Sequence, residues 1–375
     1  MACAFRPCDG AAMDCSFLMP SLFMKRVRAG SRRRVAGRRL AGVAIGAALS
    51  LAFPASAQAQ DAGALKSFKD WVVGCDNLRA CVALGLGPEA GVGDAYVRVR
   101  RGADAGARPE LTITLAADGG GVAPALSLSL DGAPAVPPKA TARRDGDFLS
   151  ATLGAAQAAP FLAALREGKT LAVALKGAEK AKISLTGAAA ALLYMDAAQN
   201  RAGTASALVD RGDAPFPAIT APIEPVVAAA RMRLVRPPPS PPKALASSGD
   251  DSCRGYEPIA VALSATETLW GLCDLAAAYN FAYRFWIVGP DGARPAAFPG
   301  ADQDGPVLTN PGLVRDGLAL AMFEKGRGAG DCGRSAQWAY DGAGFRLVLL
   351  SQMDECRGVA PGDWPVLYRA ALRPL

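Results

Sequence analysis

Residues 68–81 read FKDWVVGCDNLRAC, and this short block decides how the first sheet of the protein begins. The run from Trp71 to Cys75 is apolar and rich in β-branched residues, which predicts a strand. Asp76 then favours a turn, and the chain returns at Cys81. A disulfide between the two cysteines would pin the resulting hairpin, with the indole of Trp71 covering the sheet. The block is therefore typical of a stabilising element, and it carries no catalytic signature.

Alternating apolar and polar residues continue this pattern through the first half of the chain. They occur over Tyr96–Arg100, Leu111–Leu115 and Leu126–Leu130, and they predict half-buried antiparallel strands separated by turns. Two other stretches, Gln157–Glu167 and Ala188–Asn200, have helical spacing instead. We expect a hairpin between these two helices. The sequence thus predicts a small antiparallel sheet with helices packed on one face.

The second half of the chain has similar features. Residues 338–349 contain an Asp-Gly turn between alternating aromatic and aliphatic residues, which is a strong hairpin signal. Upstream, Tyr279, Phe281, Tyr283 and Phe285 recur at every second position. Residues spaced by two share one face of a strand, so this face is aromatic and is expected to face the core.

Proline marks the boundary between the two halves. Nine prolines lie between Ala214 and Pro242, and the last five form a run too rigid for a helix and lacking N–H donors for a sheet. The predicted fold class is α+β, with two antiparallel-sheet-rich domains that contain a few helices and are stapled by disulfides. The predicted parts are an over-extended start plus signal peptide (1–59), an N-terminal sheet domain with two helices (60–213), a Pro-rich linker (214–250) and a C-terminal sheet-rich domain (251–375).

Residues 1–59 have the features of an export signal. A basic stretch from Lys25 to Arg39 precedes an apolar run, Leu40–Phe53, and small residues around Ala57 suit a signal peptidase. Met24 opens a more conventional signal peptide than Met1 does, so we expect an over-extended start. The apolar run has about 14 residues, fewer than the roughly 20 that a spanning helix needs. We therefore expect export by the general secretion route into the periplasm, with no membrane span after signal cleavage.

The net charge of +7 belongs to this leader. Residues 1–59 hold nine cations and two anions, and subtracting these from the 41 cations and 34 anions of the chain leaves 32 of each. Because the remainder is neutral, its charge gives no reason to expect a nucleic-acid partner.

Six cysteines remain after the leader is removed. An even number in an exported chain indicates disulfides, and six cysteines allow 15 pairings. The Pro-rich linker separates two of them from the other four, which favours pairing between neighbours. The predicted pairs are Cys75 with Cys81, Cys253 with Cys273, and Cys332 with Cys356. The alternative is a metal site, but the sequence has no Cys-x-x-Cys and no histidine, so we expect neither a metal nor another cofactor.

The absence of histidine removes the commonest catalytic sites. It excludes His-ligated zinc, Ser-His-Asp triads and Cys-His pairs. Paired carboxylates can hydrolyse glycosides without histidine, so a carboxylate-dependent hydrolase acting on envelope glycan is the alternative function. Its candidate residues are the acids near the later cysteines and Trp364, namely Asp331, Asp354, Glu355 and Asp363. No other catalytic constellation is found, so we expect a protein that is not an enzyme.

Several blocks resemble a family of exported proteobacterial proteins known as domain of unknown function 1176. Residues 68–81 resemble its opening, Ala191–Asp210 is similar to its middle, and Lys325–Gly333 and Met353–Gly358 resemble its closing half. The resemblance implies export and a similar architecture, and it brings no reaction or catalytic residue. Trp71–Cys81 also resembles the start of the invasion-associated locus B family of exported proteins from host-associated bacteria.

The expected function is binding. We expect a periplasmic protein of unknown function that binds an envelope component or another periplasmic protein. The candidate binding surface combines a charged, glycine-rich turn with the aromatic residues of the next hairpin. It consists of Lys325, Arg327, Asp331, Trp338 and Tyr340.

Overall fold

The structure, a computed structural model, describes residues 62–88, 95–117, 124–216, 222–245, 250–300 and 305–375. The predicted leader lies outside the described residues. All described residues belong to one compact unit. Antiparallel sheets dominate this unit, and its described part contains two α-helices.

The block at residues 68–81 forms the predicted hairpin. Its strands pair antiparallel, with Cys75 opposite Cys81 and Trp71 opposite Gly85. A Cβ at Gly85 would lie 2.6 Å from the Trp71 ring, so glycine makes room for the indole to lie across the sheet. The hairpin belongs to a seven-stranded antiparallel sheet with the order β1 (Leu65–Phe68), β2 (Trp71–Cys75), β3 (Cys81–Gly85), β4 (Ala95–Arg101), β5 (Glu110–Ala116), β9 (Phe148–Leu153) and β8 (Arg143–Asp145).

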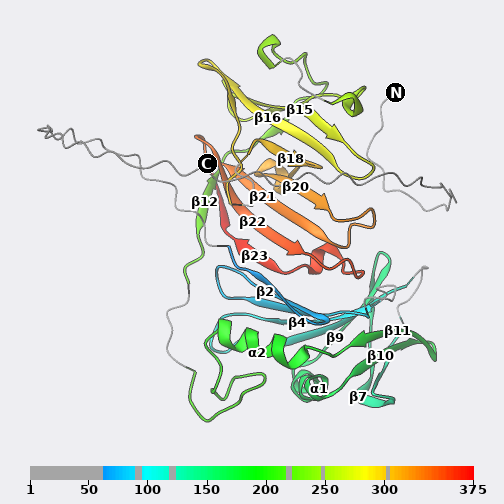
Figure 1. The fold of residues 1–375 in the computed structure, drawn as a ribbon. Helices are drawn as coiled ribbons and strands as arrows, with labels where there is room; N and C mark the ends of the chain where they lie inside the picture. The colour runs from blue at the N-terminus through cyan, green and yellow to red at the C-terminus, as the bar shows by residue number, and fades with distance from the viewer. Residues whose placement is uncertain (1–61, 89–94, 118–123, 217–221, 246–249, 301–304) are drawn as a thin grey trace, which may run out of the picture. The chain divides into compact units, whose positions relative to one another are not determined.

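Two helices pack against this sheet, as the sequence predicts. Helix α2 (Ala188–Ala198) contacts β2 and β3, and it also contacts α1 (Ala155–Glu167) (Figure 1). Buried leucines and alanines of both helices share one hydrophobic core with the inward face of the sheet. A four-stranded sheet completes this core, in the order β11 (Ala178–Ser184), β10 (Thr170–Leu175), β6 (Leu126–Leu130) and β7 (Ala133–Ala140).

The later part of the chain builds two more antiparallel sheets around a second core. The first sheet contains β13 (Arg233–Leu234), β14 (Ile259–Ala262), β15 (Thr268–Ala276), β16 (Phe281–Gly289) and β17 (Gly292–Pro295), with β18 (Val307–Thr309) also paired to β16. The second contains β19 (Gly312–Val314), β20 (Ala319–Lys325), β21 (Gly333–Tyr340), β22 (Phe345–Met353) and β23 (Val366–Arg369). Short 3-10 helices are η1 (Lys243–Leu245), η2 (Asp251–Cys253), η3 (Arg315–Gly317) and η4 (Pro361–Asp363).

The segment expected to be a Pro-rich linker contains strands of its own. Strand β12 (Val226–Ala229) pairs in parallel with β24 (Ala371–Pro374), at the end of the chain. Met232 is buried in the second core, and β13 joins a sheet. The proline run itself, residues 237–242, has neither helix nor strand.

Three disulfides staple the sheets. The Cα–Cα distances are 4.0 Å for Cys75–Cys81, 5.6 Å for Cys253–Cys273 and 4.7 Å for Cys332–Cys356. These pairs confirm the local pairing that the spacing predicts.

The two parts of the sequence share a hydrophobic cluster. Val72, Leu84 and Tyr96 from the first sheet pack with Met353 and Trp364 from the region around the third disulfide. The disulfide-stapled, sheet-rich α+β class is thus confirmed, whereas the division into two independent domains stays a prediction.

Candidate functional site

The two aromatic residues of the predicted binding surface are core residues. Trp338 and Tyr340 are each 1% exposed. The indole Nε1 of Trp338 donates to the carbonyl of Pro299 at 2.9 Å, and its ring lies 5.4 Å from that of Phe298. Tyr340 donates its hydroxyl to Glu267, and burial together with this hydrogen bond raises the pKa of Tyr340 to about 12. This burial corrects the expectation that the two side chains contact a partner.

The charged part of the predicted surface is the turn Lys325–Asp331, which is held in place by hydrogen bonds. Arg327 donates from Nε and Nη2 to the two carboxylate oxygens of Asp331, at 2.7 and 2.6 Å. The backbone N–H of Gly358 donates to the same carboxylate at 2.6 Å. Because Gly358 follows Cys356 closely, the carboxylate and the Cys332–Cys356 disulfide fix the same turn. Asp331 is therefore a structural residue, while the Arg327 side chain is about half exposed at 49%.

Asp331→Asn is expected to remove one source of acid sensitivity. Burial acts to raise the pKa of Asp331, but the hydrogen bonds from Arg327 and Gly358 outweigh it and hold that pKa below its usual value. A lowered pKa contributes stability that is present above about pH 4 and is lost as the pH falls further. The variant should lose roughly 1–2 kcal/mol of unfolding free energy at pH 7, with the difference shrinking below pH 4. Urea unfolding at several pH values measures the difference in unfolding free energy between the variant and the wild type. A difference that does not change with pH would contradict the lowered pKa of Asp331.

A different set of aromatic residues is exposed beside this turn. We call Tyr256, Tyr279 and Phe281 the aromatic patch. Tyr256 is 43% exposed and Tyr279 is 38% exposed, and Phe281 is half-buried. The rings of Tyr256 and Phe281 lie 5.4 Å apart. The sequence predicted a core-facing aromatic stripe from Tyr279 to Phe285, but only Phe285 is fully buried.

Asparagine side chains hold the patch against the charged turn. Asn280 Nδ2 donates to the carbonyl of Lys325 at 2.9 Å, and the Lys325 N–H donates back to Asn280 Oδ1 at 3.1 Å. Asn310 Nδ2 donates to the carbonyl of Phe323 at 2.8 Å. A Cβ at Gly328 would lie 3.6 Å from the Tyr279 ring, so the aromatic ring and the glycine-rich turn are neighbours.

The second disulfide holds the other side of the patch. Cys253–Cys273 ties the segment that carries Tyr256 to strand β15. In the same segment, Ser252 Oγ accepts from the N–H of Ala276 at 3.0 Å. Tyr283 is a neighbour of Tyr256, and burial together with this neighbour raises the pKa of the Tyr283 hydroxyl. A covalent bond and local hydrogen bonds thus present Tyr256 at the surface.

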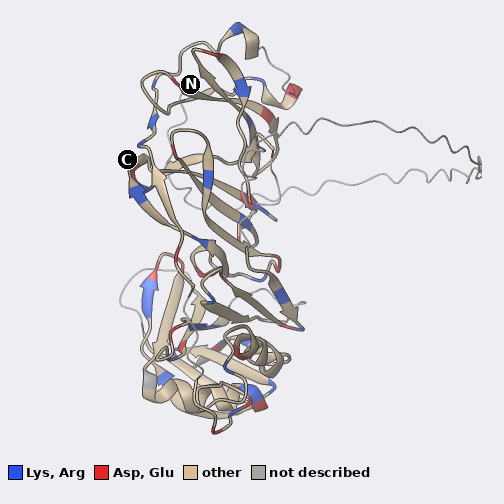
Figure 2. Ribbon diagram, turned by 90° about the vertical axis from the view of Figure 1, so that its left-hand side faces the viewer, with Lys and Arg blue, Asp and Glu red and all other residues tan. Residues whose placement is uncertain are grey.

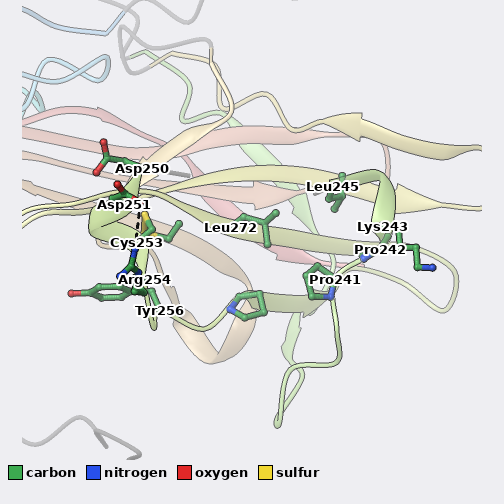
Figure 3. A pocket seen from close by; sticks show the side chains of 12 residues that line it. Pro241, Pro242, Lys243, Leu245, Asp250, Asp251, Cys253, Arg254, Tyr256 and Leu272 are labelled. Atoms are coloured by element: carbon green, nitrogen blue, oxygen red, sulfur yellow. Dashed lines mark ion pairs between the residues drawn. A yellow bond between two sulfur atoms is a disulfide. The ribbon is translucent and has the colours of Figure 1, made fainter. Parts of the chain in front are cut away.

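A cavity of about 550 Å³ opens next to Tyr256 (Figure 3). Its apolar lining comes from Pro241, Pro242, Leu245, Tyr256, Pro258 and Leu272. Four charged residues also line it, namely Lys243, Asp250, Asp251 and Arg254. This mixture of flat apolar surfaces and a few charged groups is typical of small-molecule sites.

Two of the carboxylates named for a hydrolase, Asp331 and Asp363, are held by hydrogen bonds within the protein. The other two candidates are Asp354 and Glu355. Asp363 accepts hydrogen bonds from Tyr96 Oη at 2.5 Å and from Arg98. The lowered pKa of Asp331 is the opposite of what a general acid needs. Trp364, expected beside these acids as a sugar contact, is only 2% exposed.

Charged residues of both signs are interspersed along the described ribbon (Figure 2). In the part of the chain that the structure describes, no three His, Cys, Asp or Glu side chains gather where they could hold a metal ion. Among the same residues, no helix has both the length and the apolar character to cross a membrane.

Sequence comparison agrees with the resemblance of the cysteine-containing blocks. The family model described as "Protein of unknown function (DUF1176)" matches residues 65–371. The chain is 30% identical over 341 residues to "Uncharacterized protein YpfG" of Escherichia coli strain K12, which covers 82% of this chain and 93% of that protein. No solved structure matches, and neither match shows the similarity to the locus B family. The chain therefore belongs to the DUF1176 family.

Proposed function

We propose that this protein is exported to the periplasm and binds an envelope component there through the aromatic patch, without catalysing a reaction. The observation that carries the proposal is the exposure of Tyr256 and Tyr279, with Tyr279 next to the glycine-rich turn that holds the half-exposed Arg327. Exposed aromatic and arginine side chains are enriched where proteins bind partners.

The way the patch is built supports a binding role. Large side chains that serve only stability are usually buried, because exposure wastes their transfer free energy. Here a disulfide and two asparagine side chains hold exposed rings in place. A rigid patch loses less conformational entropy when a partner binds. The three disulfides suit an oxidising compartment, which supports the proposed location.

The test is cosedimentation with envelope fractions. The full chain is expressed in a Gram-negative host, recovered from the periplasm, and incubated with purified peptidoglycan sacculi and with outer-membrane vesicles. We expect one fraction to retain the protein, and we expect Tyr279→Ala to reduce retention by about tenfold. Val136→Ala is the matched control, because Val136 is also an exposed apolar residue, at 74%, and lies on strand β7 away from the patch.

Three results would contradict the proposal. They are recovery of the protein only from the cytosol with free thiols, equal retention of the Tyr279→Ala and Val136→Ala variants, and release of new reducing ends from sacculi. The last result would support the hydrolase alternative instead.

A further inference from the structure

We propose that the cavity beside Tyr256 binds an uncharged pyranose unit of an envelope glycan. The inference rests on the proposed function and assigns a ligand class to one side of the aromatic patch. It is carried by the size of the cavity, by the chemistry of its lining and by the state of its charged groups.

The size of the cavity fits a small sugar. Its volume of about 550 Å³ lies within the range of roughly 300–1,000 Å³ typical of small-molecule sites. A site of this size has room for one or two sugar rings. The proposal therefore commits to a small ligand and not to a docked protein domain, for which a stable interface would bury about 800 Å² of surface per partner.

The lining offers flat apolar surfaces. Tyr256 contributes an aromatic ring that packs near Phe281 on one side and stays 43% exposed. Pro258 and Leu272 add further apolar surface. A pyranose ring presents axial C–H groups on one face, and these pack well on the negative face of an aromatic ring. Figure 3 shows Tyr256 and Arg254 at one end of the cavity, Lys243 at the other and Leu272 between them.

The charged groups of the lining suit a neutral polyhydroxyl ligand. Lys243 and Arg254 balance Asp250 and Asp251, so the cavity selects neither anions nor cations. Arg254 Nη2 lies 3.7 Å from Asp251 Oδ1, and the two side chains are 86% and 100% exposed. This ion pair is therefore weak. Sugar hydroxyls can donate to the carboxylates and accept from the guanidinium. One sugar can therefore form hydrogen bonds with both the acidic and the basic side chains of the cavity.

The wall that carries these groups is fixed before a ligand arrives. Asp250 caps η2 by accepting from the N–H of Ser252 at 2.8 Å, and this hydrogen bond lowers the pKa of Asp250. The Cys253–Cys273 disulfide ties the same segment to β15. Arg254 and Tyr256 follow directly, so their backbone is held close to its bound position and the entropy cost of binding is small.

The test is isothermal titration of the full chain with two defined sugars. N,N′-diacetylchitobiose represents the glycan strands of peptidoglycan, and laminaribiose represents a periplasmic glucan. Binding of either one, with a Kd of about 10 μM to 1 mM, is expected, and the preferred sugar identifies the source of the glycan. Glutamate and spermidine serve as anionic and cationic probes, and neither should bind.

Two variants separate the contacts. Tyr256→Ala should weaken sugar binding by about tenfold, whereas Tyr256→Phe keeps the ring and should stay within about threefold of the wild type. Arg254→Gln should weaken binding by about threefold or more. Because the Arg254 side chain is 86% exposed, this variant tests the site even if Tyr256→Ala disturbs the local fold. Val136→Ala should bind like the wild type.

The outcomes distinguish this inference from the proposed function. If sacculi retain the protein through Tyr279 but neither disaccharide binds up to about 10 mM, the sugar site is wrong and the binding function stands. Sugar binding that is unchanged in both Tyr256→Ala and Arg254→Gln places the sugar elsewhere and also overturns the inference. If neither envelope fraction retains the protein, the proposed function itself fails.

Discussion

The Asp196→Ala variant is expected to lose about 3–5 kcal/mol of unfolding free energy. The Asp196 carboxylate is fully buried and accepts from Arg101 Nη2 at 2.7 Å. Its other oxygen accepts from the N–H groups of Leu208 and Val209, at 2.8 and 3.0 Å. Truncation leaves a buried guanidinium without its counter-charge and the N–H groups of Leu208 and Val209 without this acceptor. Burial already lowers the pKa of Arg101, and Asp196 is the group that opposes this effect.

Urea unfolding followed by circular dichroism at pH 7 measures this loss. Asp213→Ala removes an exposed aspartate from the segment that follows α2, so it is the matched control and should stay within about 0.5 kcal/mol of the wild type. Asp196→Asn should fall between the two, since it keeps an oxygen acceptor and loses the charge. A change below about 1 kcal/mol for Asp196→Ala would mean that the network with Arg101 contributes little to stability.

The local features of this fold could be predicted from the sequence. The hairpin of β2 and β3, the two helices and the three disulfides all depend on residues close together in the chain. Period-two patterns identify strands because successive side chains point to opposite faces. Pairing between neighbouring cysteines follows because short loops are easily closed.

Long-range packing could not be predicted in this way. Strand β12 pairs with β24, about 145 residues later in the chain, and no local pattern encodes that contact. Every residue of β2 is buried, because Trp71 and Val73 face the core with the helices while Val72 joins a cluster with Trp364. A sequence shows which residues share one face of a strand, but it does not show whether one or both faces of that strand are packed against other elements.

The candidate site shows the same limit. The alternation places Phe281, Tyr283 and Phe285 on one face of β16, but the burial of these side chains decreases toward the start of the strand. Only Phe285 is fully buried, next to Phe298 at 5.8 Å, while Tyr279 lies in the preceding loop. Asn280, a turn-forming residue inside the series, was the signal that Tyr279 lies outside the strand.

Trp338→Ala is expected to lose about 3–5 kcal/mol of unfolding free energy while the folded fraction keeps its affinity for the envelope fraction. Trp338 lies on β21, between β20 and β22, and its ring packs against Phe298. Truncation therefore opens a cavity between the two sheets of the second core and leaves the carbonyl of Pro299 without its donor. Trp338→Phe should cost less, because it refills most of the volume and loses only the hydrogen bond.

Comparing the stability and the retention of Trp338→Ala with those of Tyr279→Ala distinguishes a core residue from a binding residue. That variant removes an exposed ring, so it should change the unfolding free energy by less than about 1 kcal/mol while reducing retention on the envelope fraction. Thermal unfolding and cosedimentation on both variants give opposite profiles if the structure assigns the residues correctly. A Trp338→Ala protein that is as stable as the wild type but fails to bind would indicate that the binding surface lies on the hairpin of β21 and β22. Such a result would require Trp338 to be exposed, because losing a 1%-exposed indole from a packed core without destabilisation contradicts the cost of forming a cavity.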